Sequence, residues 1–153
     1  MKATHFGFPF FYYPLKLEGW YKYKAGANFS SKGEIIEGKK DKCDIYGVLY
    51  ETDDNVQFLD GSTSLTSPNI VALARNLDAL PETDNWKQFS FKFEPKNGKS
   101  IDSDKLEKGI YKLAIVFSSS VDGGKFEGAV GSTLYIDKVV IEHTSNTNEY
   151  PAN

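Results

Sequence analysis

The strongest constraint on the fold is an apolar residue at every second position, repeated in several short segments that turns separate. In residues 86–93 three phenylalanines alternate with polar residues, and residues 109–120 and 132–143 contain similar runs. Side chains along a β-strand point alternately to the two faces of its sheet, so this spacing predicts strands with a buried face. The core residues that it predicts are Phe89, Phe91, Leu113, Ile115, Leu134 and Ile136.

The other segments support an all-β chain. Residues 15–24 alternate in the same way, and residues 43–51 are apolar on both faces, which is typical of a central strand. Residues 67–80 fit either a short helix or a strand, and the β context favours the strand. Residues 100–110 indicate a turn or a single helical turn. Short strands without long helices between them predict an antiparallel β-sandwich, either immunoglobulin-like or a jelly roll.

The last predicted strand contains a shift in its pattern. Leu134 and Ile136 keep a period of two, whereas Val139 and Ile141 resume that period one residue out of phase. One extra residue in a paired strand forms a β-bulge. The sequence therefore predicts a bulge at Asp137–Lys138.

Composition limits the domain organisation and the class of partner. The 153 residues suffice for one domain, which we expect over residues 1–142, followed by a polar tail at 143–153. The net charge is −3 and no basic stripe is present, so nucleic acid is not an expected partner. The longest apolar run, residues 8–15, is too short for a transmembrane segment, and the first residues lack the apolar region of a signal peptide.

The chain offers few residues for a disulfide, a zinc site or a catalytic triad. Cys43 is the single cysteine, so no internal disulfide forms. His5 and His143 stand at opposite ends of the sequence, which argues against a zinc site of cysteine and histidine and against a Ser-His-Asp triad.

Three segments, residues 4–26, 86–93 and 115–141, together resemble a known family, the "putative carbohydrate metabolism domain" of surface proteins and lipoproteins of gut bacteria. The most specific part of the match consists of Ser118–Ser120, Gly123-Gly124, Phe126, Gly128, Gly131-Ser132 and the strand Leu134 to Ile141 with Asp137. The resemblance implies a jelly-roll sandwich of the galactose-binding or lectin-like kind, similar to non-catalytic carbohydrate-binding modules.

The same resemblance implies a setting and partners. It implies a periplasmic or cell-surface location at the outer membrane, with a glycan or polysaccharide as ligand. Members of the family usually have a further segment before the counterpart of Thr4. We therefore expect a sandwich that is incomplete at its N-terminal edge, and an open sheet edge through which a homo-oligomer could form.

Exposed aromatic residues are the candidates for sugar binding. Trp20 shares a predicted strand face with charged residues, and Trp86 shares one with Gln88 and other polar residues. Sugar rings stack on such indole faces while polar neighbours bind the hydroxyl groups. Tyr12 and Tyr13 could add the rim of a loop. The alternative is that each tryptophan packs beneath a loop or onto a further segment.

Asp137 is the candidate metal ligand. A structural calcium ion needs six to eight oxygen ligands, so Asp137 would need backbone carbonyls and Glu18 or Glu142 beside it. The alternative is a bulge residue whose carboxylate accepts backbone N–H groups. No other cofactor is expected.

The sequence does not contain a persuasive pair of catalytic carboxylates. A glycosidase needs two acids across the scissile bond. Glu34 and Glu37 lie in a predicted loop, and Glu51, Asp53 and Asp54 cluster at a strand end, as in a solvated turn. We therefore expect a non-catalytic carbohydrate-binding domain. A structural or protein-interaction domain is the alternative, and a glycoside hydrolase ranks third.

Overall fold

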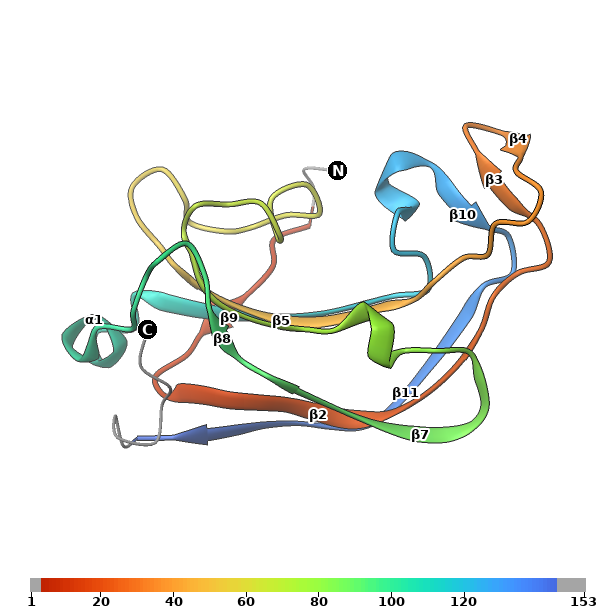
Figure 1. Cartoon of the computed structure of the whole chain (residues 1–153). Coiled ribbons are helices and arrows are strands. Elements are labelled where there is room, and N and C mark those ends of the chain that lie inside the picture. The colour runs from red at the N-terminus through yellow and green to blue at the C-terminus, as the bar shows by residue number, and fades with distance from the viewer. Residues whose placement is uncertain (1–3, 146–153) are drawn as a thin grey trace.

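The structure is a computed structural model that describes residues 4–145, and two stacked antiparallel sheets form its body (Figure 1). The five-stranded sheet has the order β1 (Phe8–Pro9), β9 (Tyr111–Ser118), β5 (Asp44–Glu51), β6 (Ile70–Arg75) and β8 (Glu94–Pro95). The three-stranded sheet has the order β11 (Thr133–Thr144), β2 (Tyr13–Lys24) and β7 (Thr83–Lys92). The predicted all-β, antiparallel sandwich is confirmed.

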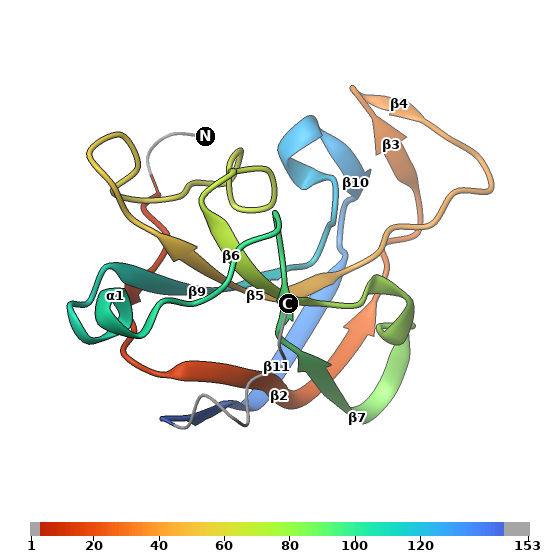
Figure 2. The same ribbon diagram turned by 60° about the vertical axis from the view of Figure 1, so that its left-hand side comes forward.

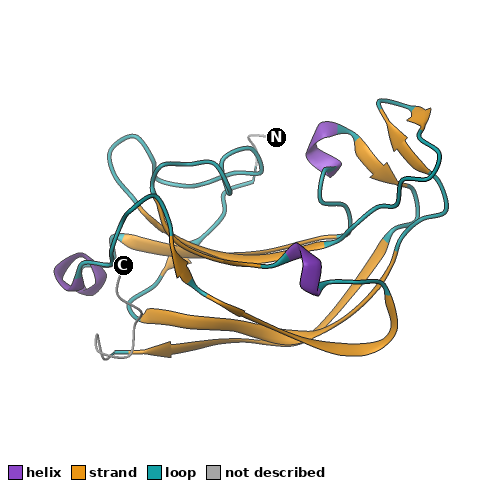
Figure 3. Cartoon of the chain, in the orientation of Figure 1, coloured by secondary structure: helices purple, strands orange, loops and turns teal. Residues whose placement is uncertain are grey.

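A small third sheet stands away from one end of the sandwich (Figure 2). Its strands, in spatial order, are β10 (Glu127–Ala129), β3 (Phe29–Ser31) and β4 (Glu34–Ile35). Within the described residues, helical structure is confined to three short pieces, which Figure 3 shows among the strands and loops: α1 (Ser103–Glu107), η1 (Leu77–Ala79) and η2 (Gly123–Lys125). None of the helices in residues 4–145 is long and apolar enough to cross a bilayer.

The structure shows which conformation the ambiguous segments take. Residues 70–75 form a strand, as the β context indicated, and the 3-10 turn η1 follows them. Residues 103–107 form a single helical turn that begins after Asp102, whose carboxylate accepts the N–H of Lys105. Residues 44–51 form the middle strand of the larger sheet and are buried on both faces up to Tyr50.

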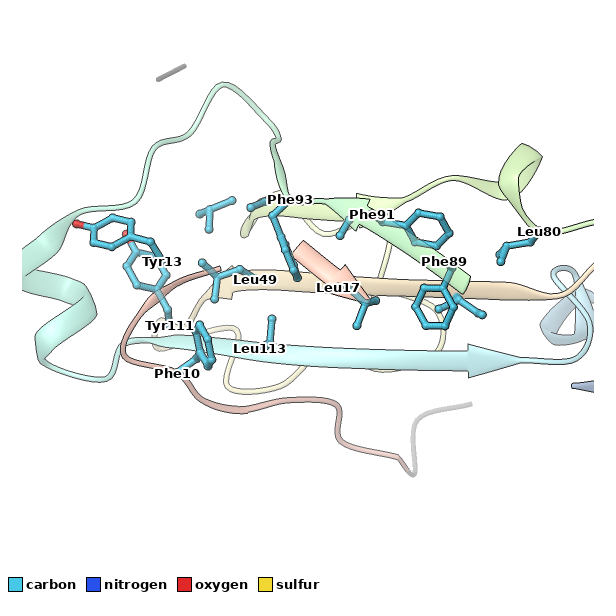
Figure 4. Packing of buried hydrophobic residues seen from close by; sticks show 14 of the residues in the cluster. Phe10, Tyr13, Leu17, Leu49, Leu80, Phe89, Phe91, Phe93, Tyr111 and Leu113 are labelled. Carbon is cyan, nitrogen blue, oxygen red and sulfur yellow. The ribbon is translucent and has the colours of Figure 1, made fainter. Parts of the chain in front are cut away.

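The main core fills the space between the two sheets (Figure 4). Phe89, Phe91 and Leu113 are buried there, as predicted, whereas the predicted core residues Ile115, Leu134 and Ile136 are only partly buried against it. Leu134 and Ile136 lie on β11, which is an edge strand, and Ile115 lies on β9 beyond the short pairing with β1. An edge strand has a neighbour on one side only, so its inward side chains are less well covered.

The two outer faces of the sandwich differ in how far other side chains cover them. A second cluster covers the outer face of the five-stranded sheet, where Tyr46, Val48 and Tyr50 pack against Leu59 and Ile70. Leu59 lies in the loop that follows β5. Such side chains need cover because contact between large apolar surfaces and water is unfavourable. On the outer face of the three-stranded sheet, large side chains remain exposed, among them Trp20, Trp86 and Tyr135.

The single thiol is part of the main core, which gives a first prediction. Cys43 is 1% exposed, and burial raises the pKa of its thiol to about 12. The thiolate is the reactive species, and at pH 8 roughly one thiol in ten thousand would be ionised. We expect Cys43 of the native protein to be nearly inert toward Ellman's reagent and to react fully after unfolding in urea. Rapid complete reaction in native buffer would contradict this placement.

Candidate functional site

The candidate site is the outer face of the three-stranded sheet, at the end where β2 finishes. Alternation along the three strands turns Leu17, Tyr21 and Phe89 into the core and leaves every second residue outside. We call the outward residues near this end the open face. It consists of Trp20, Lys22, Trp86, Gln88, Tyr135 and Asp137.

The aromatic residues of the open face come from three different strands. Trp20 on β2 is 38% exposed, Trp86 on β7 is 44% exposed and Tyr135 on β11 is 55% exposed. Trp20 and Trp86 are thus both partly accessible, which fits the stacking interpretation better than its alternative of packing beneath a loop. Tyr135 was not among the predicted site residues. The same signal could have found it, because it lies between polar residues on the outward side of its strand.

The register of the sheet arranges these residues in rows across the strands. One row has Lys22 in the middle, directly opposite Tyr135, with its ammonium 5.0 Å from the ring centroid of Tyr135 and 5.0 Å from that of Trp86. In the next row Trp20 pairs with Gln88 on one side and with Asp137 on the other. The face therefore alternates flat aromatic surfaces with hydrogen-bonding groups.

A polar row and a small hollow flank these aromatic rows. Glu18 lies opposite Ser90 and accepts a hydrogen bond from its hydroxyl at 3.1 Å. At the opposite end of the open face, a hollow of about 150 Å³ lies beside Lys22. Its lining consists of Lys22, Tyr23, Lys24, Thr83, Asp84 and Tyr135. The surface is shallow, and it offers groups of both charges.

The bulge predicted in the last strand is present, but its two residues are Lys138–Val139, one position later than predicted. Asp137 pairs with Trp20 and Val140 with Glu18, so two residues of β11 stand opposite the single residue Gly19. Lys138 takes a left-handed conformation with φ of 51°, and its N–H donates to Oδ1 of Asp137 at 2.8 Å. The carboxylate of Asp137 thus has the local role given by the bulge alternative. Within residues 4–145 no group of three or more His, Cys, Asp or Glu side chains could hold a metal ion.

The predicted tyrosine rim lies elsewhere and only half of it is exposed. Tyr12 is accessible and stacks on His143, with ring centroids 4.4 Å apart. Tyr13 is 5% exposed and belongs to the main core, which corrects its placement on an exposed rim. It begins β2, where its side chain enters the space between the sheets. Both lie at the end of β2 away from Trp86.

The serine- and glycine-rich segment before β11 surrounds a buried carboxylate that sequence reasoning missed. Asp41 is 3% exposed, and its Oδ2 accepts hydrogen bonds from the hydroxyls of Ser120 and Ser132 and from the N–H of Ala129. Its Oδ1 accepts the N–H of Lys42. A side chain at Gly128 would collide with Ser120 and Asp41. The segment is therefore architectural: it anchors the start of β11 beside the candidate site.

Among residues 4–145, three carboxylates have a pKa that hydrogen bonding lowers. A general acid needs a raised pKa, which burial without a partner would provide. The described carboxylates with shifted pKa values are Asp53, Asp60 and Glu82, and all three shift downward. Hydrogen bonds to the ionised form cause this: Glu82 accepts from Lys40, Asp53 from Asn69 and Asp60 from Ser62. The predicted acidic turn at Asp53 is thus a hydrogen-bonded turn.

Comparisons with known proteins place this fold among relatives. A crystal structure from Bacteroides thetaiotaomicron, described as a putative glycoside hydrolase, is 50% identical with a TM-score of 0.91, over 95% of this chain and 42% of that one. A second from Bacteroides vulgatus, described in the same words, is 43% identical with a TM-score of 0.84, over 93% of this chain and 57% of that one. The chain thus spans about half the length of these relatives.

The remaining comparisons concern curated proteins and families. No curated protein matches the chain. The model of one family matches residues 1–142, nearly the whole chain. The protein therefore belongs to the family described as "Putative carbohydrate metabolism domain".

Proposed function

We propose that this domain binds glycans without cleaving them, through the open face, as part of a bacterial surface system for glycan use. The observation that carries the proposal is the set of three accessible aromatic rings, Trp20, Trp86 and Tyr135, on one sheet face. Large exposed aromatic residues in one region are unfavourable in water and mark binding surfaces. Membership of a carbohydrate-related family supports a sugar as the ligand.

The physical mechanism is stacking combined with hydrogen bonding. A sugar ring presents a flat face of C–H groups, and indole and phenol rings offer rigid surfaces that lose little conformational entropy on contact. Gln88, Glu18 and Asp137 lie within the neighbouring rows and provide donors and acceptors for hydroxyl groups. Because the face is shallow, we expect a dissociation constant near the millimolar range, about −4 kcal/mol. Attachment beside other binding modules would raise the avidity.

Binding is favoured over hydrolysis for this chain. The chain covers 42% and 57% of the two relatives described as putative glycoside hydrolases, so that description belongs to those longer proteins and not to this domain in particular. A retaining or inverting mechanism needs one carboxyl group kept protonated near neutral pH. Hydrogen bonds lower the pKa of Asp53, Asp60 and Glu82, so these three carboxyl groups do not meet that need.

A protein-interaction domain is the second candidate, and two features favour it. The small third sheet carries exposed apolar side chains, namely Ile35 and, beside β10, Phe126 and Val130. Phe126 is 84% exposed and has a φ of 60°, a strained conformation for a bulky residue.

The edge of β11, which pairs only with β2 among the described residues, is a place where a second copy of the chain could add a strand.

A glycan array followed by titration tests the proposed function. We expect weak binding of at least one polysaccharide, reduced about tenfold or more, ~1.4 kcal/mol, in Trp86→Ala and in Trp20→Ala. Phe126→Ala is the matched control, because it removes an exposed aromatic ring from the turn before β10, away from the open face. Binding that survives the Trp20→Ala/Trp86→Ala double variant would show that the open face is not the site. Loss of binding only in Phe126→Ala would move the function to the third sheet.

A further inference from the structure

Lys22 has an unusual position for a surface lysine. Its ammonium lies 5.0 Å from each of two aromatic rings, at the middle of a row whose outer members are Trp86 and Tyr135. In the part of the chain that the structure describes, no carboxylate oxygen lies within ion-pair distance of it. The rings attract the ammonium by cation–π interaction, and the N–H donors that do not point at the rings are available to a ligand.

The surroundings of Lys22 are locally basic. Lys24 follows two residues later on the same side of β2, and both lysines line the hollow of about 150 Å³. Asp84 is the single carboxylate in that lining, so the lining carries a net charge of +1. The whole chain has a net charge of −3, and the positive charge beside the aromatic row therefore runs against the overall charge.

The other charges of this sheet face are engaged or lie further along it. Glu18 accepts the hydroxyl of Ser90, and Lys16 forms an ion pair with Glu142 at 3.8 Å, toward the far end of β2. Asp137 accepts the N–H of Lys138 and is in the next row, opposite Trp20. The end of the face around Lys22 is thus suited to an anion, whereas the rows beyond it are suited to neutral hydroxyl groups.

We propose that the ligand is an acidic polysaccharide and that Lys22, supported by Lys24, binds its carboxylate or sulfate group. A sugar unit stacked on Trp86 or Tyr135 would bring its charged substituent to the ammonium between the two rings. Charge-assisted hydrogen bonds are stronger than neutral ones, so the anionic group would add both affinity and orientation. This inference rests on the proposed glycan-binding function and names its substrate class.

Pairs of glycans that differ only in charge test the inference. The first pair is an oligogalacturonate and its methyl ester, and the second is dextran sulfate and dextran; the two pairs distinguish a carboxylate from a sulfate. We expect the protein to bind the charged member of at least one pair about tenfold more tightly, with weaker binding as salt concentration rises. In Lys22→Gln the preference should fall to within about twofold.

A matched control separates a local effect from the loss of one positive charge. Lys108→Gln removes the same charge from an exposed position next to α1, and it should leave the preference unchanged. Equal binding of both members of each pair, or an unchanged preference in Lys22→Gln, would overturn the acidic-ligand inference. If neutral glycans of the array still bind, the proposed glycan-binding function stands and only the acidic-ligand inference fails. If the array shows no glycan bound, both proposals fail.

Discussion

Replacing Asp41 by alanine is expected to destabilise the domain by about 3 kcal/mol. The buried carboxylate accepts hydrogen bonds from two hydroxyls and two backbone N–H groups, and alanine would leave these donors without an acceptor. Each buried donor left unsatisfied costs about 1–3 kcal/mol, although the hydroxyls can turn toward water. Urea unfolding followed by tryptophan fluorescence would measure the loss in the free energy of unfolding.

Two further variants sharpen this test. Asp41→Asn keeps the shape but replaces one accepting oxygen by a donating NH₂ group, so it should lose most of the same stability. Asp54→Ala removes an exposed aspartate and should change the free energy of unfolding by less than about 0.5 kcal/mol. A loss of less than about 1 kcal/mol in the free energy of unfolding of Asp41→Ala would show that the carboxylate does not stabilise the segment before β11.

Replacing Phe93 by alanine should destabilise the domain by about 3–5 kcal/mol, the largest effect that we expect from one side chain. Phe93 is 1% exposed and lies where the chain leaves β7 in one sheet and enters β8 in the other. Its ring packs against the backbone of Gly47 in β5: a Cβ there would lie 2.6 Å from Cζ of Phe93. Truncation would empty the space between the two sheets beside this crossing.

The contact with Gly47 makes the prediction specific. Gly47→Ala alone should destabilise the protein by about 1–3 kcal/mol, because the methyl group collides with the ring. In the Phe93→Ala background the same change should be neutral or stabilising, since the ring is gone and alanine restricts the unfolded chain more than glycine. A double-mutant cycle on unfolding free energies measures this coupling. Additive effects would contradict the packing of Phe93 against Gly47.

Local patterns in the sequence determined the strands and the sides of each strand. The alternation of Phe89 and Phe91 with polar residues fixes one buried and one exposed face, because backbone geometry alone sets a period of two. The phase shift in the last strand located the bulge to within one residue, at Lys138–Val139, for the same reason. These properties need no knowledge of the strand partners.

Whether a side chain is buried, in contrast, was decided by the tertiary structure. Tyr12 and Tyr13 are neighbours in an aromatic run, yet one is exposed and the other enters the core, since the strand begins between them. Ile115 keeps the inward phase of β9 but lies at an incompletely covered edge. Periodicity predicts the direction of a side chain, whereas burial depends on how far the adjacent elements extend.

The candidate site itself exists only through the pairing of distant segments. Lys22, Trp86 and Tyr135 are about 60 and 50 residues apart in sequence, and the register of β11 and β7 on β2 brings them into one row. Asp41 likewise meets Ser120 and Ser132 across some 80 to 90 residues. Each outward residue was predictable from its own strand, but its neighbours were not, because register is set by the combined packing of all strands against the core.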